Sequence, residues 1–314
     1  MSKSSNKWIG ITLGDPGGIG PEVVAKAFND PATRHSARFI LIGDYPVYKK
    51  YSSILYPTCI FEDVKHTPLN RLKIGRPSKE GAQASLIYLN RAIQLLKAKE
   101  ISSLVTAPVC KETISSIDKN FVGHTEYLAE NFKVKEVGMM FVSKKFRIML
   151  VTHHIPLNKV SAFINQKNIL ETIKLSHLSL KRTFKIQRPR IAVCGLNPHA
   201  GEKGILGKEE ITKIIPAIKQ AQRDHINVQG PFAADTLFAP RITQHFDAII
   251  AMYHDQGLIP AKALDFSHVV NLTVGLSFIR TSPAHGTAFD IAGKNKADPS
   301  SMKEAIKLAS RLSA

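Results

Sequence analysis

Imidazole side chains follow three separate apolar runs, and they are the residues of this sequence best suited to chemistry. The runs are 147–151, 190–194 and 248–252, and the histidines after them are His154, His199 and His254. An apolar run without turn residues predicts a strand buried on both faces. Because ligands bind beyond the carboxyl ends of strands in open α/β sheets, we expect the three imidazoles to converge on one point.

Three neutral imidazoles with an open coordination position are typical ligands of a divalent metal, with zinc first by ligand type. A single histidine after a strand is more often a turn residue than a ligand. The repetition of the whole pattern favours ligation. The sequence therefore predicts a metal site formed by residues that lie far apart along the chain.

The size and composition indicate an ordinary globular enzyme-sized protein. The chain has 314 residues, 44% of them hydrophobic, which is enough for two domains or one large α/β unit. It has no apolar run as long as a membrane span and no apolar segment typical of a signal peptide behind residues 1–7. Its three cysteines are widely spaced and form no Cys-x-x-Cys motif. We expect a reducing, cytoplasmic setting without disulfides.

The formal net charge of +18 raises the question of a polyanionic partner. One local cluster of basic residues lies at 181–190, between a predicted helix and a predicted strand. Nucleic-acid binding is one interpretation. No sequence pattern of a nucleic-acid-binding fold accompanies the cluster, so we favour a basic surface that steers anionic ligands inward.

Strands alternate with helices along the chain, which predicts a mostly parallel sheet. The predicted strands are 8–13, 38–43, 103–108, 137–142, 147–152, 190–195, 248–252, 269–273 and 278–282. The predicted helices are 78–99, 125–132, 168–185 and 299–312, with a short helix around Lys262. Residues 143–146 separate two adjacent strands as a hairpin turn would, so we expect one antiparallel pair.

Two helix starts have two interpretations each. The turn 14–20 leads into Pro21 and Glu22, and its backbone N–H groups either meet an anion or let the helix pack closely on the strand. Thr125 is predicted to be the N-cap of the next helix. His124 beside it either contacts a phosphate or serves only the helix start.

Several motifs together resemble the 4-hydroxythreonine-4-phosphate dehydrogenase family. They are 14–22, 123–126, 152–157, 196–202, 234–236, 253–257, 270–276 and 280–282. The first motif also resembles the glycine turn of isocitrate and isopropylmalate dehydrogenases, whose two-domain fold this family shares. The sequence departs from the family at Gly17, in the stretch 282–286 and in its basic balance.

The resemblance implies an α/β fold with two α/β/α subdomains, a mostly parallel sheet and a cleft between the subdomains. Residues 1–123 plus 265–314 would form a discontinuous first subdomain. Residues 124–264 would form the second, with the metal histidines and the dimer contacts. The family builds its site at a homodimer interface, with His154 and His199 from one subunit and His254 from the other.

The resemblance also implies the substrate and its contacts. The substrate-binding residues would be His124, Thr125, Lys262, Asn271 and Arg280. The reaction would be the oxidation of 4-phosphooxy-L-threonine by NAD or NADP with one divalent metal (Zn, Mg or Co), followed by decarboxylation, in vitamin B6 biosynthesis. Lys262, Asp235 and Asp255 are rival catalytic groups, and each carboxylate has the alternative role of orienting a histidine.

Three other functions stay open at this point. A sister dehydrogenase of threonate or erythronate 4-phosphate would use the same motifs. A metal hydrolase would use the same imidazoles to activate water. A nucleic-acid-binding protein would show salt-sensitive binding without nicotinamide turnover. We expect a small phosphorylated substrate, a homodimer, and neither a nucleic acid nor a membrane as partner.

Overall fold

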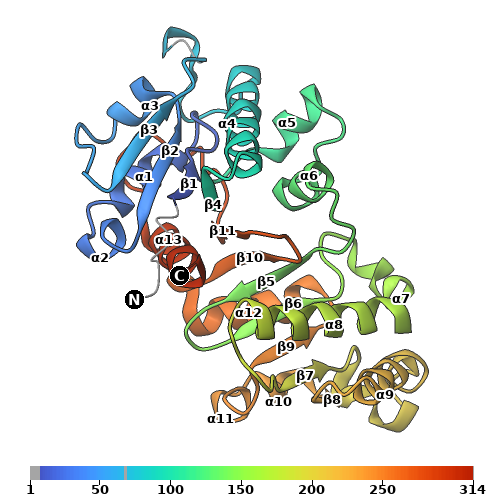
Figure 1. Cartoon of the computed structure of the whole chain (residues 1–314). Helices are drawn as coiled ribbons and strands as arrows, with labels where there is room; N and C mark the ends of the chain where they lie inside the picture. Colours follow the sequence, from blue (N-terminus) through green and yellow to red (C-terminus); the bar gives the residue numbers. More distant parts are fainter. Residues whose placement is uncertain (1–7, 67–68, 314) are drawn as a thin grey trace, which may run out of the picture. The chain divides into compact units, whose positions relative to one another are not determined.

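The computed structural model describes residues 8–66 and 69–313, which form two compact units (Figure 1). The first unit comprises the described residues up to Lys135 together with those from Val270 onward, and the second is Glu136–Val269. The sequence prediction placed the boundaries after residues 123 and 264. In the structure the helix α6 (His124–Asn131) lies in the first unit.

The first unit contains a mostly parallel sheet of apolar strands. Its strands are β1 (Trp8–Thr12), β2 (Arg38–Gly43), β3 (Cys59–Asp63), β4 (Ile101–Thr106), β10 (Val270–Val274) and β11 (Ile279–Pro283). Their order is β3-β2-β1-β4-β11-β10, and every pair is parallel except β10–β11. Ile9 and Ile11 of β1 are fully buried, as expected for a strand covered on both faces.

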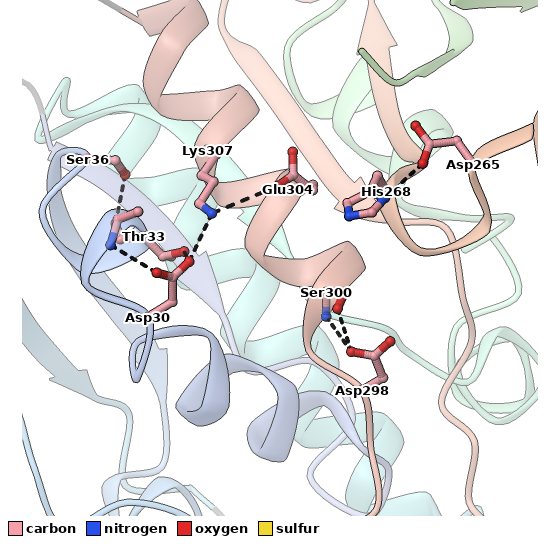
Figure 2. Close-up of polar contacts among 10 residues, drawn as sticks. Asp30, Thr33, Ser36, Asp265, His268, Asp298, Ser300, Glu304 and Lys307 are labelled. Carbon is pink, nitrogen blue, oxygen red and sulfur yellow. Dashed lines mark hydrogen bonds and ion pairs between the residues drawn. The ribbon is translucent and has the colours of Figure 1, made fainter. Parts of the chain in front are cut away.

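Helices cover this sheet. They are α1 (Gly20–Ala27), α2 (Pro31–Arg34), α3 (Tyr45–Lys49), α4 (Lys79–Lys97), α5 (Lys111–Ile117), α6 and α13 (Ser300–Ser313), with a 3₁₀ turn at Leu69–Arg71. Ser78 caps α4, because its hydroxyl accepts a hydrogen bond from Gly81 N–H at 3.0 Å. Lys307 of α13 reaches Asp30, the N-cap of α2, at 2.9 Å (Figure 2).

The glycine-rich turn between β1 and α1 is completely buried. The Gly17 N–H group donates to Asp15 Oδ1 at 2.9 Å, and Ile19 N–H donates to the Thr287 carbonyl at 2.9 Å. Gly14 has a φ of 70°, and a Cβ there would lie 2.3 Å from the Pro108 carbonyl oxygen. These N–H groups already have partners inside the protein, so the structure favours close packing over anion binding for this turn.

The second unit contains five further strands. Its strands are β5 (Gly138–Val142), β6 (Arg147–Leu150), β7 (Ile191–Cys194), β8 (Val228–Phe232) and β9 (Ala248–Ala251), in the order β5-β6-β9-β7-β8. The predicted hairpin is present, since β5 and β6 are antiparallel and Ser143 N–H donates to the Phe146 carbonyl at 3.0 Å. The other pairs are parallel.

The remaining elements of the second unit connect these strands. Its α-helices are α7 (Val160–Phe163), α8 (Gln166–Arg182), α9 (Ile215–Arg223), α10 (Ala234–Leu237), α11 (Pro240–Thr243) and α12 (His254–Asp265), and its short turns are η2 (Leu157–Lys159), η3 (Pro198–Gly204), the π-helix η4 (Glu210–Ile214) and η5 (Phe266–His268). The predicted α/β class with a mostly parallel sheet is therefore confirmed. No helix in the described part of the chain has the length and apolar character needed to cross a membrane.

Candidate active-site residues

A buried guanidinium group lies on the β10–β11 pair of the first unit. The Arg280 side chain donates from Nη1 to Thr273 Oγ1 at 3.0 Å and from Nη2 to Thr106 Oγ1 at 2.6 Å. Thr273 is the cross-strand partner of Arg280 in the register of the two strands. The residue is only 3% exposed, and its Nε atom has no hydrogen-bond partner in the described structure. The strand register and the two hydrogen bonds therefore hold the positive charge of Arg280 in place.

The charge of Arg280 is not neutralised by a carboxylate. Burial lowers the pKa of Arg280 to about 10, and the charge of Glu126 opposes that shift. No ion pair with Arg280 occurs among residues 8–66 and 69–313. A buried cation held only by hydroxyl groups is costly. An anionic ligand would remove that cost.

Two further basic side chains act on this region electrostatically. Burial and then the charges of Arg280 and Lys111 hold the pKa of His124 well below its ordinary value, so its imidazole is neutral at neutral pH. The Lys111 ammonium lies beside the start of α6, because a Cβ on Gly123 would be 3.4 Å from its Nζ. Sequence reasoning missed Lys111, which carries no motif of its own.

The predicted N-cap role of Thr125 is wrong. Gly123 is the N-cap of α6 in an extended conformation, and the helix begins at His124. Thr125 is buried, and its Oγ1 lies 3.3 Å from Oγ1 of Thr273. The hydroxyl therefore faces the strand pair that carries Arg280 instead of the helix terminus.

The other predicted substrate contacts divide between the two units. Asn271 lies on β10 two residues before Thr273, so both side chains point to the same face of the sheet. Its Oδ1 is buried without a hydrogen-bond partner in the described structure. Lys262 belongs to the second unit, where it is exposed on α12 with its Nζ 5.9 Å from the ring centre of Phe266.

Two of the three predicted metal ligands meet in the second unit. The ring centres of His154 and His254 are 5.8 Å apart. The strands before them, β6 and β9, are parallel neighbours, so both histidines follow the same sheet edge. They line a cavity of about 460 Å³ together with His153, Ile155, Leu157, Val160, Tyr253 and Asp255. Nδ1 of His254 and Oδ1 of Asp255 are 2.7 Å apart, and this contact orients the imidazole ring.

The third predicted ligand, His199, lies on an exposed turn after β7. The strand β7 also pairs with β9, so the turn leaves the same edge of the sheet. Within the described residues of one chain, no group of three His, Cys, Asp or Glu side chains is spaced to hold a metal ion. Asp235 is exposed on α10, where its Oδ1 accepts a hydrogen bond from the Thr236 N–H at 2.9 Å.

A mostly parallel α/β chain with a fixed buried cation in one unit and an imidazole-lined pocket at the strand ends of the other has the construction of an α/β small-molecule enzyme. Comparison with known proteins makes the class specific. Residues 31–309 match the family described as pyridoxal phosphate biosynthetic protein PdxA. The chain belongs to this family, whose curated members are oxidoreductases.

Individual relatives cover nearly the whole chain. The 4-hydroxythreonine-4-phosphate dehydrogenase of Desulforapulum autotrophicum is 42% identical over 96% of this chain and 94% of its own length. A relative from Oceanobacillus iheyensis, named provisionally as a D-threonate 4-phosphate dehydrogenase, is 40% identical over 95% of each chain. The crystal structure of 4-hydroxythreonine-4-phosphate dehydrogenase from Klebsiella pneumoniae is 34% identical, covers 98% of this chain and 100% of its own, and superimposes with a TM-score of 0.87.

Proposed function

We propose that this chain oxidises 4-phosphooxy-L-threonine to 2-amino-3-oxo-4-phosphooxybutanoate with NAD or NADP as the hydride acceptor. The product then loses carbon dioxide to give 3-amino-2-oxopropyl phosphate, a step toward pyridoxal phosphate. In the oxidation, the C3–H bond breaks with its electron pair transferred to the nicotinamide, and the hydroxyl proton goes to a base. The names of the relatives, and the length over which they match this chain, support this reaction.

The single observation that carries the proposal is the buried, unneutralised guanidinium of Arg280. A phosphate group would supply the missing negative charge and accept charge-assisted hydrogen bonds from it. The neutral imidazole of His124 and the hydroxyl of Thr125 lie on the adjoining helix start, and Asn271 has an unused acceptor on the neighbouring strand. Lys262 of the second unit is proposed as a further substrate contact.

We propose His154, His199 and His254 as the ligands of one divalent metal ion. The three imidazole nitrogens fit zinc or cobalt better than magnesium, which prefers oxygen ligands. A metal ion in this position would lower the pKa of the substrate hydroxyl. Within the described residues of one chain no three such groups come together, so we propose that two copies of the chain share the site, with His154 and His199 from one subunit and His254 from the other.

Exposed apolar side chains support the homodimer. Leu157, Ile205 and Ile259 are each at least 65% exposed, and each follows one of the three histidines by six residues or fewer. Leu157 also lines the pocket, and exposed apolar side chains beside a binding site are typical of an interface. The interface would therefore be formed by the same surface that carries the metal ligands.

The proton acceptor is proposed from the remaining polar groups. The contact between Asp255 and His254 supports an orienting role for this carboxylate, which leaves Lys262 and Asp235 as candidates for the base. Both are exposed in the described chain, as a group that meets the substrate has to be before it binds. The glycine-rich turn before α1 is filled by internal contacts, so we assign no part of the dinucleotide to it.

The test is the absorbance of reduced nicotinamide with the purified full-length chain. We expect turnover of 4-phosphooxy-L-threonine with NAD or NADP, loss of turnover after chelation, and recovery with Co²⁺ or Zn²⁺. The unphosphorylated 4-hydroxy-L-threonine is the matched control and should react far more slowly. No nicotinamide reduction with any phosphorylated substrate would refute the proposal.

A second substrate class deserves a parallel assay because of one comparison. The relative from Oceanobacillus iheyensis is nearly as similar to this chain as the first curated relatives are. D-Threonate 4-phosphate and D-erythronate 4-phosphate carry the same phosphate and hydroxyl groups but lack the amino group. A higher kcat/KM with either of them would assign the chain to that sister activity.

A further inference from the structure

The turn that carries His199 has an unusual backbone. Five consecutive residues, 199–203, have φ between 42° and 77°, in the left-handed region, and only Gly201 among them is a glycine. Side chains with a Cβ are disfavoured there, so such a run persists only where the surroundings fix it. The turn follows β7 directly and is otherwise exposed. Something outside the turn must therefore hold its conformation.

The holding group is the carboxylate of Glu210, which is 2% exposed on the π-helix η4. Its Oε1 accepts hydrogen bonds from the backbone N–H groups of Leu196 and Asn197, both at 2.8 Å. Its Oε2 accepts one from Nδ2 of Asn197 at 3.0 Å. Three hydrogen bonds from the entrance of the turn thus end on one buried carboxylate.

Two glycines make room for this carboxylate. A Cβ on Gly201 would lie 2.5 Å from Oε2 of Glu210, and a Cβ on Gly195 would lie 3.2 Å from Oε1. A Cβ on Gly195 would also lie 2.8 Å from the Cα atom of Ala200. The turn is therefore packed around the carboxylate, and the hydrogen bonds are not an accidental surface contact.

A second carboxylate connects the turn to the segment after His154. Oε2 of Glu209 accepts a hydrogen bond from Nδ2 of Asn197 at 2.9 Å, and its Oε1 accepts one from Ser161 Oγ at 2.6 Å. Ser161 lies on α7, next to the pocket-lining Val160. Hydrogen bonds from Ser161 and then Asn197 lower the pKa of Glu209 to about 2, so it remains an acceptor across the assay range.

We propose that Glu210 is a positioning residue that fixes the His199 turn, and that Glu209 sets this turn against the segment that follows His154. The proposal rests on the proposed function only in assigning His199 to a metal. Both carboxylates use the same amide nitrogen of Asn197, so the geometry predicts a specific coupling. In Glu210→Gln the amide oxygen has to keep the two backbone N–H groups, so the amide nitrogen faces Nδ2 of Asn197, and flipping Asn197 only moves the conflict to Glu209. Glu209→Gln avoids this conflict, because its amide nitrogen can donate to the Ser161 hydroxyl.

The double variant E209Q/E210Q removes the conflict. With two glutamines, the Asn197 amide can flip, and its oxygen can accept a hydrogen bond from each. We therefore expect E210Q to be more disturbed than the double variant, and E209Q to be disturbed least. A role limited to general stability would instead make the double variant the worst of the three.

The experiment measures amide hydrogen exchange at Leu196 and Asn197 in metal-free full-length protein, and Co²⁺ affinity by calorimetry. We expect faster exchange and a roughly 10- to 100-fold weaker Co²⁺ affinity in E210Q, as for other groups that orient metal ligands, with the substrate KM nearly unchanged. The double variant should recover at least half of the loss on a logarithmic scale. Glu171→Gln on α8 is the matched control and should behave as the unmodified chain.

Wild-type exchange and Co²⁺ affinity in E210Q would overturn the inference, as would a double variant at least as impaired as E210Q. Should E210Q not fold, the double variant decides the question, because it should fold and approach wild-type exchange; a double variant that also fails to fold would overturn the inference. An unmodified chain that binds no Co²⁺ would refute the proposed metal site. The exchange rates would then still decide whether Glu210 holds the turn.

Discussion

The two units organise their polar groups in opposite ways. In the first unit, Arg280 is buried, held by two threonine hydroxyls and fixed by the register of two strands. In the second, His154 and His199 are exposed, and His199 lies on a left-handed turn held from outside. The first arrangement is held by contacts within one unit of one chain. The second depends on loop geometry and, in our proposal, on a second copy of the chain.

The largest expected effect comes from removing a metal ligand. His199→Ala should lower kcat/KM by about 1,000-fold, because the metal's contribution to stabilising the developing charge is worth several kcal/mol. Metal content after dialysis and Co²⁺ affinity would fall with it. Full activity at unchanged metal content would contradict the role assigned to this histidine.

The corresponding change in the first unit tests the anion site. Arg280→Gln should raise the KM of the phosphorylated substrate by roughly 100-fold, the effect of losing charge-assisted hydrogen bonds from a buried cation. Its effect on the slow reaction of unphosphorylated 4-hydroxy-L-threonine should be small. Arg311→Gln, an exposed arginine on α13, is the control. An equal loss of activity with both substrates would show that Arg280 does not bind the phosphate group.

A second buried ionisable group of the first unit, the Asp15 carboxyl, has a hydrogen-bond partner on only one of its two oxygens. Oδ1 of Asp15 accepts the Gly17 N–H, whereas Oδ2 is buried without a partner in the described structure. Burial raises the pKa of Asp15 from 3.8 to about 6. Between these values the folded chain binds more protons than the unfolded chain. Stability contributed by the neutral carboxyl is therefore lost as the pH rises through this window, by up to about 3 kcal/mol.

Asp15→Asn should accordingly stabilise the protein by about 3 kcal/mol near pH 8 and by roughly half as much near pH 5, as measured by urea unfolding. His124 has a lowered pKa and acts in the opposite direction, since its contribution is lost as the pH falls below 6.5. That contribution cancels in the difference between variant and parent. Asp118→Asn, which has the same contact to the N–H two residues on but lies nearer the surface, is the control. A gain independent of pH would contradict the account.

The strands and the long helices could be predicted from the sequence, because their apolar patterns are local. The strand at 38–43 and the helix capped by Ser78 match the structure closely. The strand β8 was not predicted, since its sequence contains Gly230 and Pro231, which ordinarily signal a turn. Burial of the turn 14–20 could not be predicted either. The carbonyl that accepts a hydrogen bond from Ile19 N–H belongs to Thr287, which lies far along the chain.

The candidate sites also divide into residues with a local sequence pattern and residues whose role depends on contacts between distant parts of the chain. Histidines after apolar runs identified the imidazole pocket, since strand ends in a parallel sheet share an edge. The supports of these residues carried no local pattern. Glu210 belongs to none of the sequence motifs, and the role of Thr273 depends on cross-strand register. Such contacts arise from the tertiary fold, and spacing in the sequence does not encode them.

The most direct test of the contrast between the two units is complementation between inactive variants. If His254 acts with His154 and His199 of the other subunit, unfolding and refolding H199A together with H254A should restore about a quarter of the wild-type activity, because half of the dimers are mixed and each has one intact site of two. A mixture of H154A with H199A should stay inactive, since neither site is then complete. No recovery in the first mixture, from subunits shown to have exchanged, would contradict a metal site shared between two chains.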